Sequence, residues 1–494
     1  MSSTTTPFAL LPNGSALPWS EVPAWTPEDL VTATARELSE GGRLCAWFGQ
    51  SGEAGVVLVC VIAFDADASL AVARSTPVHG SYPALTLLHP QAHLFEREVW
   101  EQHQVIPEGH PWLKPVRAGA GSYPLQGEFF RVNGAQVHEV AVGPVHAGII
   151  EPGHFRFQCD GEEVLHLEIA LGYQHRGIER ALRGGPHRAT LAQMETVAGD
   201  STVAHATAHT VLRAALAGVE APLRAQWIRA IGLELERLAN HTGDLGALAN
   251  DVAFLPTAAA CGKVRGDFLN LTALVCGNRF GRGLVRAGGC GYDLDTARLS
   301  TLANRLATAV RDADQAATWL WESPSVQSRF EGIGTVSSRQ ATEIGLVGPA
   351  ARACGLVRDA RFDHPTGWYR FAQAPVAVWP SGDVLARARV RALEIQRSGE
   401  FLRTQLAAGV EGPIEEPLPP PAPDTLAIAL VEGWRGEVCH VALTDHAGRF
   451  AGYKIVDPSF HNWMGLALAL RGQAISDFPV NNKSFNLSYC GFDL

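Results

Sequence analysis

Hydrophobic residues in the first third of this chain follow short, strand-like patterns. Residues 56–64 and 82–88 are apolar runs typical of strands, while 26–40 has the spacing of a short helix. Residues 128–170 alternate between apolar and polar, and the DGEE sequence inside them predicts a hairpin turn. The pattern therefore predicts a module in which helices and strands are mixed.

The spacing becomes helical further along the chain. Residues 186–408 are mainly helical by pattern, with the clearest long helices at 223–248 and 383–408. Residues 425–456 alternate as a hairpin, and a helix is expected to begin at Pro458. We predict an α+β fold, in which an N-terminal α+β module precedes a large, mainly helical domain with small β elements.

The helix at 223–248 carries a polar row beside its apolar face. The apolar face contains Trp227, Ile231, Leu235 and Leu238. The polar row contains Glu234, Arg237, His241 and Asp244. Polar groups this close to an apolar face are half buried, so they must be paired or hydrogen-bonded. We interpret the row as an internal strut, with a proton-handling lining as the alternative.

Changes in composition predict the domain boundaries. Residues 1–24 are polar and Pro-rich and predict a flexible arm, and 25–118 form the α+β module. The Gly-rich start of 119–135 predicts a linker, and 136–494 form the large domain. The Pro-rich stretch 411–423 within that domain predicts a stiff internal linker.

Two further segments interrupt these patterns. Residues 89–117 combine an amphipathic turn with a Pro-rich extended run, which we interpret as a surface motif that locks one domain onto another. The Gly-rich segment RFGRGLVRAGGCG brings Arg279, Arg282 and Arg286 close together. We expect these arginines to pair with acidic residues of the helices, with anion or ligand binding as the alternative.

Composition narrows the function classes. The chain has 494 residues and a formal net charge of −10, so nucleic acids and anionic membrane surfaces are poor candidates as direct partners. It has no secretory signal pattern and no apolar run long enough to span a bilayer, which predicts a cytoplasmic protein. The 9 cysteines contain no CxxC pair and predict reduced, buried thiols.

Motifs for common catalytic sites are missing. His205 and His209 have a metal-binding spacing in HATAH, but the glutamate of an HExxH zinc site is absent. No GxGxxG, Walker A or GxSxG sequence occurs. A second candidate cluster contains His146, His154, His175 and Glu151. Single histidines are more often structural, so these residues alone define no reaction.

Several longer segments carry a family resemblance. The EPGHFRF, DGEE and YQHRGIER sequences resemble the large subunit of group 4 membrane-bound [NiFe] hydrogenases, formate hydrogenlyase included, and the D subunit of complex I (NADH:quinone oxidoreductase). FEREVWEQHQVIPEGHPWLKPVR looks like the end of the C subunit of complex I. GVEAPLRAQWIRAIGLELERLANHTGDLGA, GTVSSRQATEIGLVGPAARACGLVRD and YKIVDPSF look like successive segments of the D subunit. The resemblance implies that 25–118 are similar to the C subunit and 136–494 to the D subunit.

This chain departs from the hydrogenases at the nickel and iron ligands. In that family two CxxC pairs supply the thiolates that bind both metals. This sequence has Ala198 and Ser201 at the first pair and Ser488 and Gly491 at the second, while Cys490 stands alone. We therefore expect no bound metal and no hydrogenase activity.

The quinone site of complex I is also altered. The resemblance places Ile150 and Gly199 where complex I has a histidine and a tyrosine at the quinone head. Candidate replacements are Asp200, Ser201, His146 and His154. Quinone reduction here is thus a hypothesis that depends on these substitutes.

The resemblance also implies roles for residues around this site. In the relatives, residues at the positions of His175, Arg176 and Arg286 face a [4Fe-4S] cluster of a small partner subunit and tune its potential. Candidate proton-handling residues are His154, Asp200 and His241. The chain has no cysteine pattern for a cluster of its own, so a redox role requires a partner.

We therefore expect a peripheral-arm subunit of a membrane-attached oxidoreductase complex, on the inner face of the cell membrane. Its expected partners are an iron-sulfur small subunit, similar to the B subunit of complex I, and, through it, antiporter-like membrane subunits. Quinone is a candidate electron acceptor. The alternatives are a non-catalytic scaffold or conformational-coupling subunit and a hydrogenase with unusual ligands.

Overall fold

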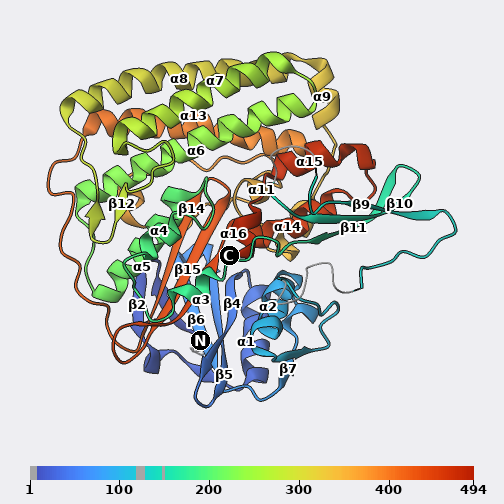
Figure 1. Cartoon of the computed structure of the whole chain (residues 1–494), viewed down its shortest axis with the longest axis vertical. Helices are drawn as coiled ribbons and strands as arrows, with labels where there is room; N and C mark the ends of the chain where they lie inside the picture. The colour runs from blue at the N-terminus through green and yellow to red at the C-terminus, as the bar shows by residue number, and fades with distance from the viewer. Residues whose placement is uncertain (1–7, 118–127, 147–150) are drawn as a thin grey trace, which may run out of the picture.

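The computed structural model describes residues 8–117, 128–146 and 151–494. Helices and sheets occur together along the chain, which confirms the predicted α+β fold class. Figure 1 shows a helical bundle at the top, a β-sheet beneath it and a second sheet with flanking helices at the bottom.

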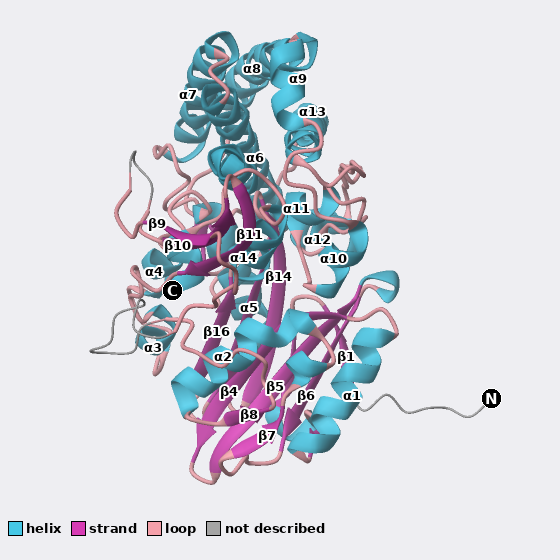
Figure 2. Ribbon diagram, turned by 90° about the vertical axis from the view of Figure 1, so that its right-hand side faces the viewer, coloured by secondary structure: helices cyan, strands magenta, loops and turns pink. Residues whose placement is uncertain are grey.

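The lower sheet contains strands from the first 75 residues, in the order β1-β6-β5-β4, with β3 parallel to β6. Its strands are β1 (Ala9–Pro12), β3 (Ala24–Trp25), β4 (Arg43–Gly52), β5 (Gly55–Phe64) and β6 (Ser69–Ser75). Helices α1 (Pro27–Ser39) and α2 (His93–His103) flank it (Figure 2). The predicted helix at 26–40 and strand at 56–64 are confirmed. Helix α1 begins where it does because the Thr26 side chain accepts the N–H of Asp29 at 3.1 Å.

The predicted strand at 82–88 is wrong over most of its length. Only the short strand β7 (Ser81–Pro83) forms, paired in parallel with β8 (Ile106–Glu108), and a 3-10 turn over Leu85–Leu87 follows. The N–H groups of Leu85 and Thr86 donate to the buried Glu96 carboxylate at 2.8 and 2.9 Å. The carboxylate therefore takes the donors that a strand would use for its ladder.

The expected flexible arm at 1–24 is also wrong for its described part, residues 8–24. Strand β1 pairs with β6, and β2 (Ser15–Pro18) pairs with β14 (Thr425–Gly433). The sheet order is β16-β15-β14-β2, with β15 at Gly436–Thr444 and β16 at Phe450–Val456. The predicted hairpin at 425–456 is thus a three-stranded meander whose edge is covered by the N-terminal segment.

A third, small sheet projects from one side of the molecule (Figure 1). Its order is β11-β10-β9, with β9 at Val137–Val142, β10 at His154–Asp160 and β11 at Glu163–Ala170. The register Asp160 opposite Glu163 confirms the hairpin predicted at DGEE. Residues 118–127 of the predicted linker region lie outside the described residues.

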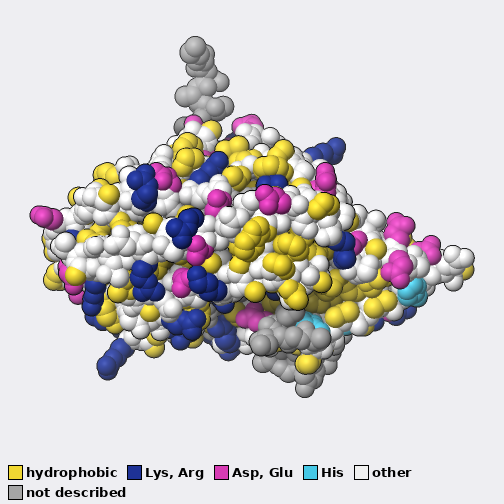
Figure 3. Space-filling model, turned by 90° about the horizontal axis from the view of Figure 1, so that it is seen from above, with side chains coloured by type: hydrophobic (Ala, Val, Ile, Leu, Met, Phe, Trp, Pro, Cys, Tyr) yellow, Lys and Arg dark blue, Asp and Glu magenta, His cyan; other side chains and the backbone are white. Residues whose placement is uncertain are grey.

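The helical bundle confirms both long helices expected from the spacing. Helix α6 covers Leu223–Asp251, and α13 covers Val384–Ala408, where the Asp383 carboxylate accepts the N–H of Ala386. Helices α7 (Leu255–Cys276) and α8 (Thr296–Glu322) complete the bundle. Its outer face mixes acidic, basic and apolar side chains (Figure 3). No helix of the described residues is long and apolar enough to cross a membrane.

Shorter elements connect the bundle to the sheets. Before α6 these are α3 (Ile178–Leu182), α4 (Thr190–Met194) and α5 (Thr202–Ala217). Between α7 and α13 they are β12 (Val285–Arg286), β13 (Gly289–Cys290), α9 (Pro324–Phe330), α10 (Ser338–Glu343), α11 (Gly348–Arg352) and α12 (Ala360–Asp363). The chain ends with α14 (Pro458–Ala469), α15 (Phe478–Phe485) and α16 (Tyr489–Asp493). Helix α14 begins at the predicted Pro458, with Asp457 as its N-cap.

The first and last parts of the chain share one hydrophobic core. A single buried cluster extends from Phe8 to Phe492. In the segment 89–117, the buried Glu98 accepts hydrogen bonds from Arg117 and from Lys454 of β16. Arg117 also donates to the Phe492 carbonyl at 2.8 Å. The segment therefore ties the lower sheet to the C-terminal helices through buried polar groups, and the domain boundaries drawn from composition stay predictions.

Candidate functional site

The two segments expected to have lost their thiolate pairs meet around Arg435, in the turn between β14 and β15. Arg435 Nη1 and Nη2 donate to the two oxygens of the Asp200 carboxylate, at 2.5 and 2.8 Å. Its Nε donates to the Asn486 carbonyl at 2.6 Å. Asp200 lies between Ala198 and Ser201, and Asn486 lies two residues before Ser488. We call this region, defined by Asp200, Ser201, Arg435 and the start of α16, the seam.

Asp200 is held firmly within the seam. Its carbonyl accepts Trp434 Nε1 at 2.8 Å and Asn240 Nδ2 at 2.9 Å, in addition to the carboxylate contacts with Arg435. Trp434 also packs edge-on against His241, with ring centroids 6.0 Å apart. The structure therefore brings Asp200, in the turn before α5, and His241, on α6, to the turn that holds Trp434 and Arg435.

His241 belongs to a buried network of charges below the seam. Its Nε2 lies 2.7 Å from Oε2 of Glu394, whose other oxygen accepts Arg352 Nη2 at 2.7 Å. Arg352 also donates to Glu432 at 2.8 Å. The remaining members are Arg237, Arg361, Glu234 and Asp359. The prediction that the polar row of α6 is buried and paired is confirmed.

The charges in this network nearly cancel. It contains the arginines Arg237, Arg352 and Arg361 and the acids Glu234, Glu394, Glu432 and Asp359. Burial raises the pKa of Glu432 to about 7 against the opposing field of Arg352. Burial also opposes ionisation of Glu394, but Arg352 and His241 hold its pKa well below its usual range. Three carboxylates then balance three guanidinium groups, and Glu432 is the member whose protonation changes near neutral pH.

Burial lowers the pKa of His241, although Glu394 acts in the opposite direction. Its Nδ1 is buried and has no hydrogen-bond partner. A neutral His241 that bonds Glu394 through Nε2–H fits this environment, because a buried imidazolium would add an uncompensated charge. The group can exchange a proton only through this one bonded nitrogen.

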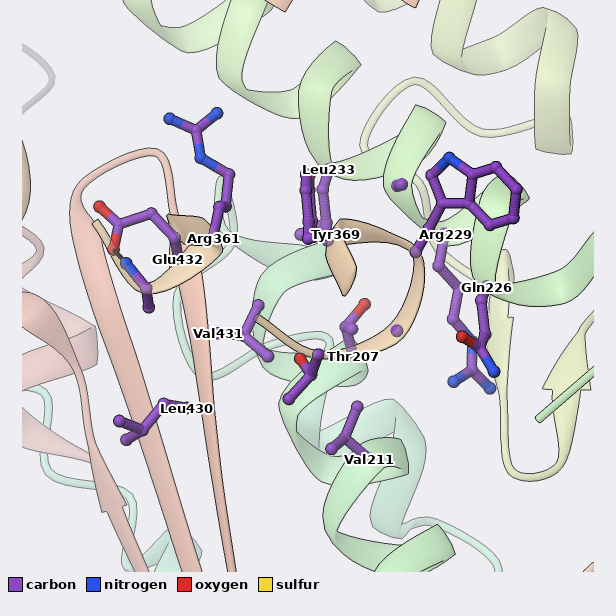
Figure 4. Close-up of a pocket in the computed structure, with 15 residues that line it drawn as sticks. Thr207, Val211, Gln226, Arg229, Leu233, Arg361, Tyr369, Leu430, Val431 and Glu432 are labelled. Carbon is purple, nitrogen blue, oxygen red and sulfur yellow. Dashed lines mark hydrogen bonds between the residues drawn. The ribbon is translucent and has the colours of Figure 1, made fainter. Parts of the chain in front are cut away.

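A small cavity of about 30 Å³ adjoins the network (Figure 4). Figure 4 shows Thr207 and Val211 of α5 facing Val431 of β14, with Leu233 and Tyr369 above them. Glu432 and Arg361 also line it. The volume suffices for one or two water molecules, so this cavity holds no cofactor or quinone.

The residues expected to face a partner's cluster lie at the surface. His175 and Arg176 are exposed, and their orientations are fixed by C-terminal carbonyls: His175 Nδ1 lies 2.8 Å from the Asp493 carbonyl and Arg176 Nη2 lies 3.0 Å from that of Cys490. Arg286 in β12 is exposed as well. These side chains are available to a neighbouring molecule while their backbones are held in place.

The expected pairing of the arginines at 279–291 is wrong. Arg279, Arg282 and Arg286 are all exposed, and within the described ranges none of them makes an ion pair with an acidic residue. The turns of this Gly-rich segment leave all three arginines exposed. The segment is a basic surface on an acidic protein.

His154 stands apart from the seam. It begins β10, where its Nδ1 lies 3.3 Å from the Gly143 carbonyl and its ring contacts Phe129. Its Nε2 is buried without a partner, and burial lowers its pKa. Glu151 instead binds the N–H groups of Tyr489 and Cys490 at the start of α16. His146 packs against Phe155, with ring centroids 6.1 Å apart, and Ile150 lies outside the described residues.

The side chains at the seam do not fit a nickel-iron centre. Ala198 has no ligand atom, and the Ser488 hydroxyl accepts the N–H of Gly491 at 2.9 Å as a helix cap. A Cβ at position 491 would lie 2.7 Å from the Asp457 carboxylate, so a cysteine there has no room. Among the residues that the structure describes, no group of three or more His, Cys, Asp or Glu could hold a metal ion. His205 and His209 bond Asp457 and Tyr453 rather than forming a zinc site.

A helical bundle closed against a β-meander, with a seam where metal thiolates would lie, defines a protein of the hydrogenase large subunit type. Residues 251–420 match the family described as the respiratory-chain NADH dehydrogenase 49 kDa subunit. The chain belongs to this family of complex I 49 kDa subunits and related group 4 hydrogenase large subunits.

Individual relatives support this membership. Formate hydrogenlyase subunit 5 of Escherichia coli is 30% identical over 436 residues, which cover 83% of this chain and 76% of that protein. The carbon monoxide-induced hydrogenase of Rhodospirillum rubrum is 30% identical, with 69% of this chain and 95% of that protein covered. The D subunit of the NADH-quinone oxidoreductase of Deinococcus radiodurans is 30% identical, with 72% of this chain and 95% of that protein covered.

Sequence reasoning missed the partners that complete the site. Arg435 lies in the sequence VEGWRGE, which reads simply as a strand turn, and Arg352 and Glu394 lie on separate helices. A charged residue within an otherwise apolar strand or helix is the one available signal, and Glu432 near the end of β14 shows it.

Proposed function

We propose that this chain is a peripheral-arm subunit of a membrane-attached oxidoreductase complex, located on the inner face of the cell membrane. In this proposal residues 25–118 correspond to the C subunit of complex I and 136–494 to the D subunit. The chain docks an iron-sulfur partner similar to the B subunit of complex I and reaches antiporter-like membrane subunits through the complex. Its relatives carry the names of formate hydrogenlyase, hydrogenase and NADH-quinone oxidoreductase subunits, which supports membership of such a complex.

The observation that carries the docking proposal is the exposed basic surface of Arg279, Arg282 and Arg286. A protein with net charge −10 that keeps these guanidinium groups unpaired and solvent-facing presents a site for an acidic partner. His175 and Arg176 would face the partner's [4Fe-4S] cluster. A positive charge and an N–H donor near a cluster raise its reduction potential.

The seam is the proposed place where electrons leave that cluster, with quinone as the candidate acceptor. Asp200 and His241 would handle protons there, and His154 would act from the edge of the small sheet. The competing function is a non-catalytic scaffold that holds subunits together or transmits a conformational change. The ion pair of Asp200 with Arg435 and the closed charge network favour the scaffold, because they immobilise the groups that catalysis would need to move. Hydrogenase activity is not proposed, because the seam lacks the thiolates for nickel.

Purification of the complex through an affinity tag on this chain tests the docking. We expect co-purified iron, an electron paramagnetic resonance signal of a reduced [4Fe-4S] cluster, and no nickel. Arg279→Glu with Arg282→Glu should release the partner. Arg305→Glu on α8, also exposed, is the matched control and should leave the assembly intact.

Activity of the intact complex separates the remaining alternatives. Quinone reduction that is lost in Asp200→Ala supports catalysis at the seam, while an assembled complex without quinone turnover supports the scaffold. A His175→Ala complex should assemble with a shifted cluster potential. A chain that purifies alone, or that carries nickel and consumes hydrogen, would refute the proposal.

A further inference from the structure

Five buried side chains form a continuous hydrogen-bonded row from α5 to the seam. His209 Nδ1 lies 2.9 Å from the Tyr453 hydroxyl, which lies 2.9 Å from His440 Nδ1. His440 Nε2 lies 3.1 Å from His205 Nδ1, and His205 Nε2 lies 3.0 Å from Asp457 Oδ2. The proposed function assigns no role to any of these contacts.

The chemistry of the groups fixes the direction of every bond in the row. An ionised Asp457 can only accept, so His205 Nε2–H donates to it and leaves Nδ1 bare. That nitrogen then accepts Nε2–H of His440, whose bare Nδ1 accepts the Tyr453 hydroxyl proton. The Tyr453 oxygen in turn accepts Nδ1–H of His209. For three neutral imidazoles, all four bonds therefore point toward Asp457.

Addition of one proton to the row reverses all four bonds. The proton binds His209 Nε2, the ring nitrogen that takes no part in the row, and His209 Nδ1 passes its proton to Tyr453. Tyr453 protonates His440 Nδ1, His440 Nε2 passes its proton to His205 Nδ1, and His205 Nε2 protonates Asp457. The result is a neutral carboxyl group and four bonds that all point away from it. Both states satisfy every group in the row, and they differ by one proton.

The surroundings favour transfer without a long-lived imidazolium. Burial lowers the pKa of His209 to about 3, with the charge of Arg213 adding to the effect. Burial and the neighbouring histidines hold the pKa of His440 well below its usual range. Burial opposes ionisation of Asp457, but His205 and Arg435 hold its pKa below its usual range. His209 and His440 therefore do not hold the proton as imidazolium groups, and a protonated Asp457 is a short-lived state of the row.

Asp457 at one end of the row and Tyr453 near the other lie in different places. Asp457 packs against Gly491, at one of the positions where the resemblance expects a metal thiolate. Tyr453 lines a cavity of about 300 Å³ that is bounded by His103 of the N-terminal part and by His175, Arg183 and Lys454. The row thus borders the seam at Asp457 and, at Tyr453, a cavity large enough for several water molecules at the junction of β16, α3 and the lower sheet.

We propose that His209, Tyr453, His440, His205 and Asp457 form a reversible one-proton relay that delivers a proton to Asp457 beside the seam and removes it again. Its use in redox turnover rests on the proposed function, whereas the relay itself does not. Tyr453, His440 and His205 are positioning and transfer residues.

Histidine tautomers measured by nitrogen-15 NMR test the relay on the whole chain with labelled histidines. In the wild type at neutral pH, we expect His205 and His440 to carry Nε2–H and His209 to carry Nδ1–H. Single His→Gln variants assign the signals. An imidazolium at any of the three, or Nδ1–H at His440, would overturn the proposal, and this measurement requires no folded variant at Asp457.

Asp457→Asn provides the sharper test. The N–H of Ser459 donates to Asp457 Oδ1 at 2.8 Å, so the amide oxygen is held there and the NH₂ group faces His205. Asn is also a good N-cap, so α14 is preserved. The amide donor should convert His205 and His440 to Nδ1–H and His209 to Nε2–H. In the double variant with Tyr453→Phe, His209 should no longer follow. Unchanged tautomers in Asp457→Asn contradict the relay.

Turnover of the assembled complex then tests the role of the relay. If the complex reduces quinone, Tyr453→Phe should lower the rate by about a hundredfold without loss of assembly. If the tautomers reverse in Asp457→Asn but quinone reduction is unchanged in Tyr453→Phe, the relay exists and its use in redox turnover is refuted. A wild-type complex with no quinone activity would refute the proposed function, while the tautomer pattern would still decide the relay.

Discussion

Arg352 offers the most direct test of the buried charge network. It is fully buried and donates four hydrogen bonds: two to Glu394 at 3.0 and 2.7 Å, one to Glu432 at 2.8 Å and one to the Arg358 carbonyl at 2.7 Å. The substitution Arg352→Met keeps the side-chain length and removes the charge. It leaves Glu394 with only Arg237 and His241, and leaves Glu432 with the N–H of Ala360.

Loss of one partner from a buried ion pair costs about 3–5 kcal/mol, because the remaining charge stays desolvated. Two carboxylates lose their main partner here, so we expect a loss of about 5 kcal/mol in the free energy of unfolding near pH 8. The cost should shrink as pH falls. Without Arg352, the folded-state pKa values of both carboxyls rise above their unfolded values, so the variant loses stability as pH rises and regains it on protonation.

Urea denaturation at about pH 8 and about pH 5.5 measures both effects through the midpoint. Arg339→Met is the matched control, since the Arg339–Glu343 pair is exposed to solvent and contributes little to stability. A loss below about 1 kcal/mol, or one that does not change with pH, would show that the network is not a set of mutually dependent charges.

Three other predictions follow from single features of the structure. Gly491→Ala should lower the unfolding midpoint, because the added Cβ would lie 2.7 Å from the Asp457 carboxylate. The control Gly262→Ala, whose Cβ would have no atom within 4 Å, should be neutral or slightly stabilising. Equal midpoints of the two variants would contradict the close contact. Burial raises the pKa of Glu236 to about 8 in the folded chain. The stability that protonated Glu236 contributes is therefore lost as pH rises from the pKa of the unfolded chain toward this value. Between about pH 5 and about pH 8 the unfolding midpoint of Glu236→Gln should rise relative to that of the wild type, and a constant difference would refute this. Deletion of residues 1–18 removes β1 and β2, so it should destabilise the chain and promote aggregation through the open edges of β6 and β14, while deletion of 1–7 is the control. A fully stable 1–18 deletion would show that these two strands contribute nothing.

The long helices illustrate which features local sequence could predict. Helices α6 and α13 have apolar residues at helical spacing over many turns, and α1 and α14 begin at capping residues, so periodicity and caps located all four. The error at 82–88 arose from the buried Glu96 carboxylate, which lies ten or more residues away and captures the backbone donors. The missed strand β2 has the same cause on a larger scale, because Ser15 pairs with Ile428.

In the candidate site, too, local sequence predicted some features and long-range contacts set the others. His241 and Glu234 were visible as a polar row beside an apolar face, whereas their counter-charges Arg352, Arg361 and Glu394 come from other elements. Local pattern shows that a charge will be buried, but it does not show what pairs with it. The arginines at 279–291 show the converse: their spacing suggested internal pairing, and the turns of the segment placed them in solvent.

The sequence by itself determined the α+β class, the long helices, the family and the loss of all four thiolate ligands, because each of these is written in local spacing or in the identity of single residues. Only the tertiary structure decided that Arg435 joins the two segments of the seam, that the N-terminal strand completes the C-terminal sheet, and that three histidines, a tyrosine and an aspartate stand in one row. These arrangements depend on contacts between residues hundreds of positions apart, where the free energy of a hydrogen bond or ion pair is set by burial and geometry rather than by neighbours in the chain.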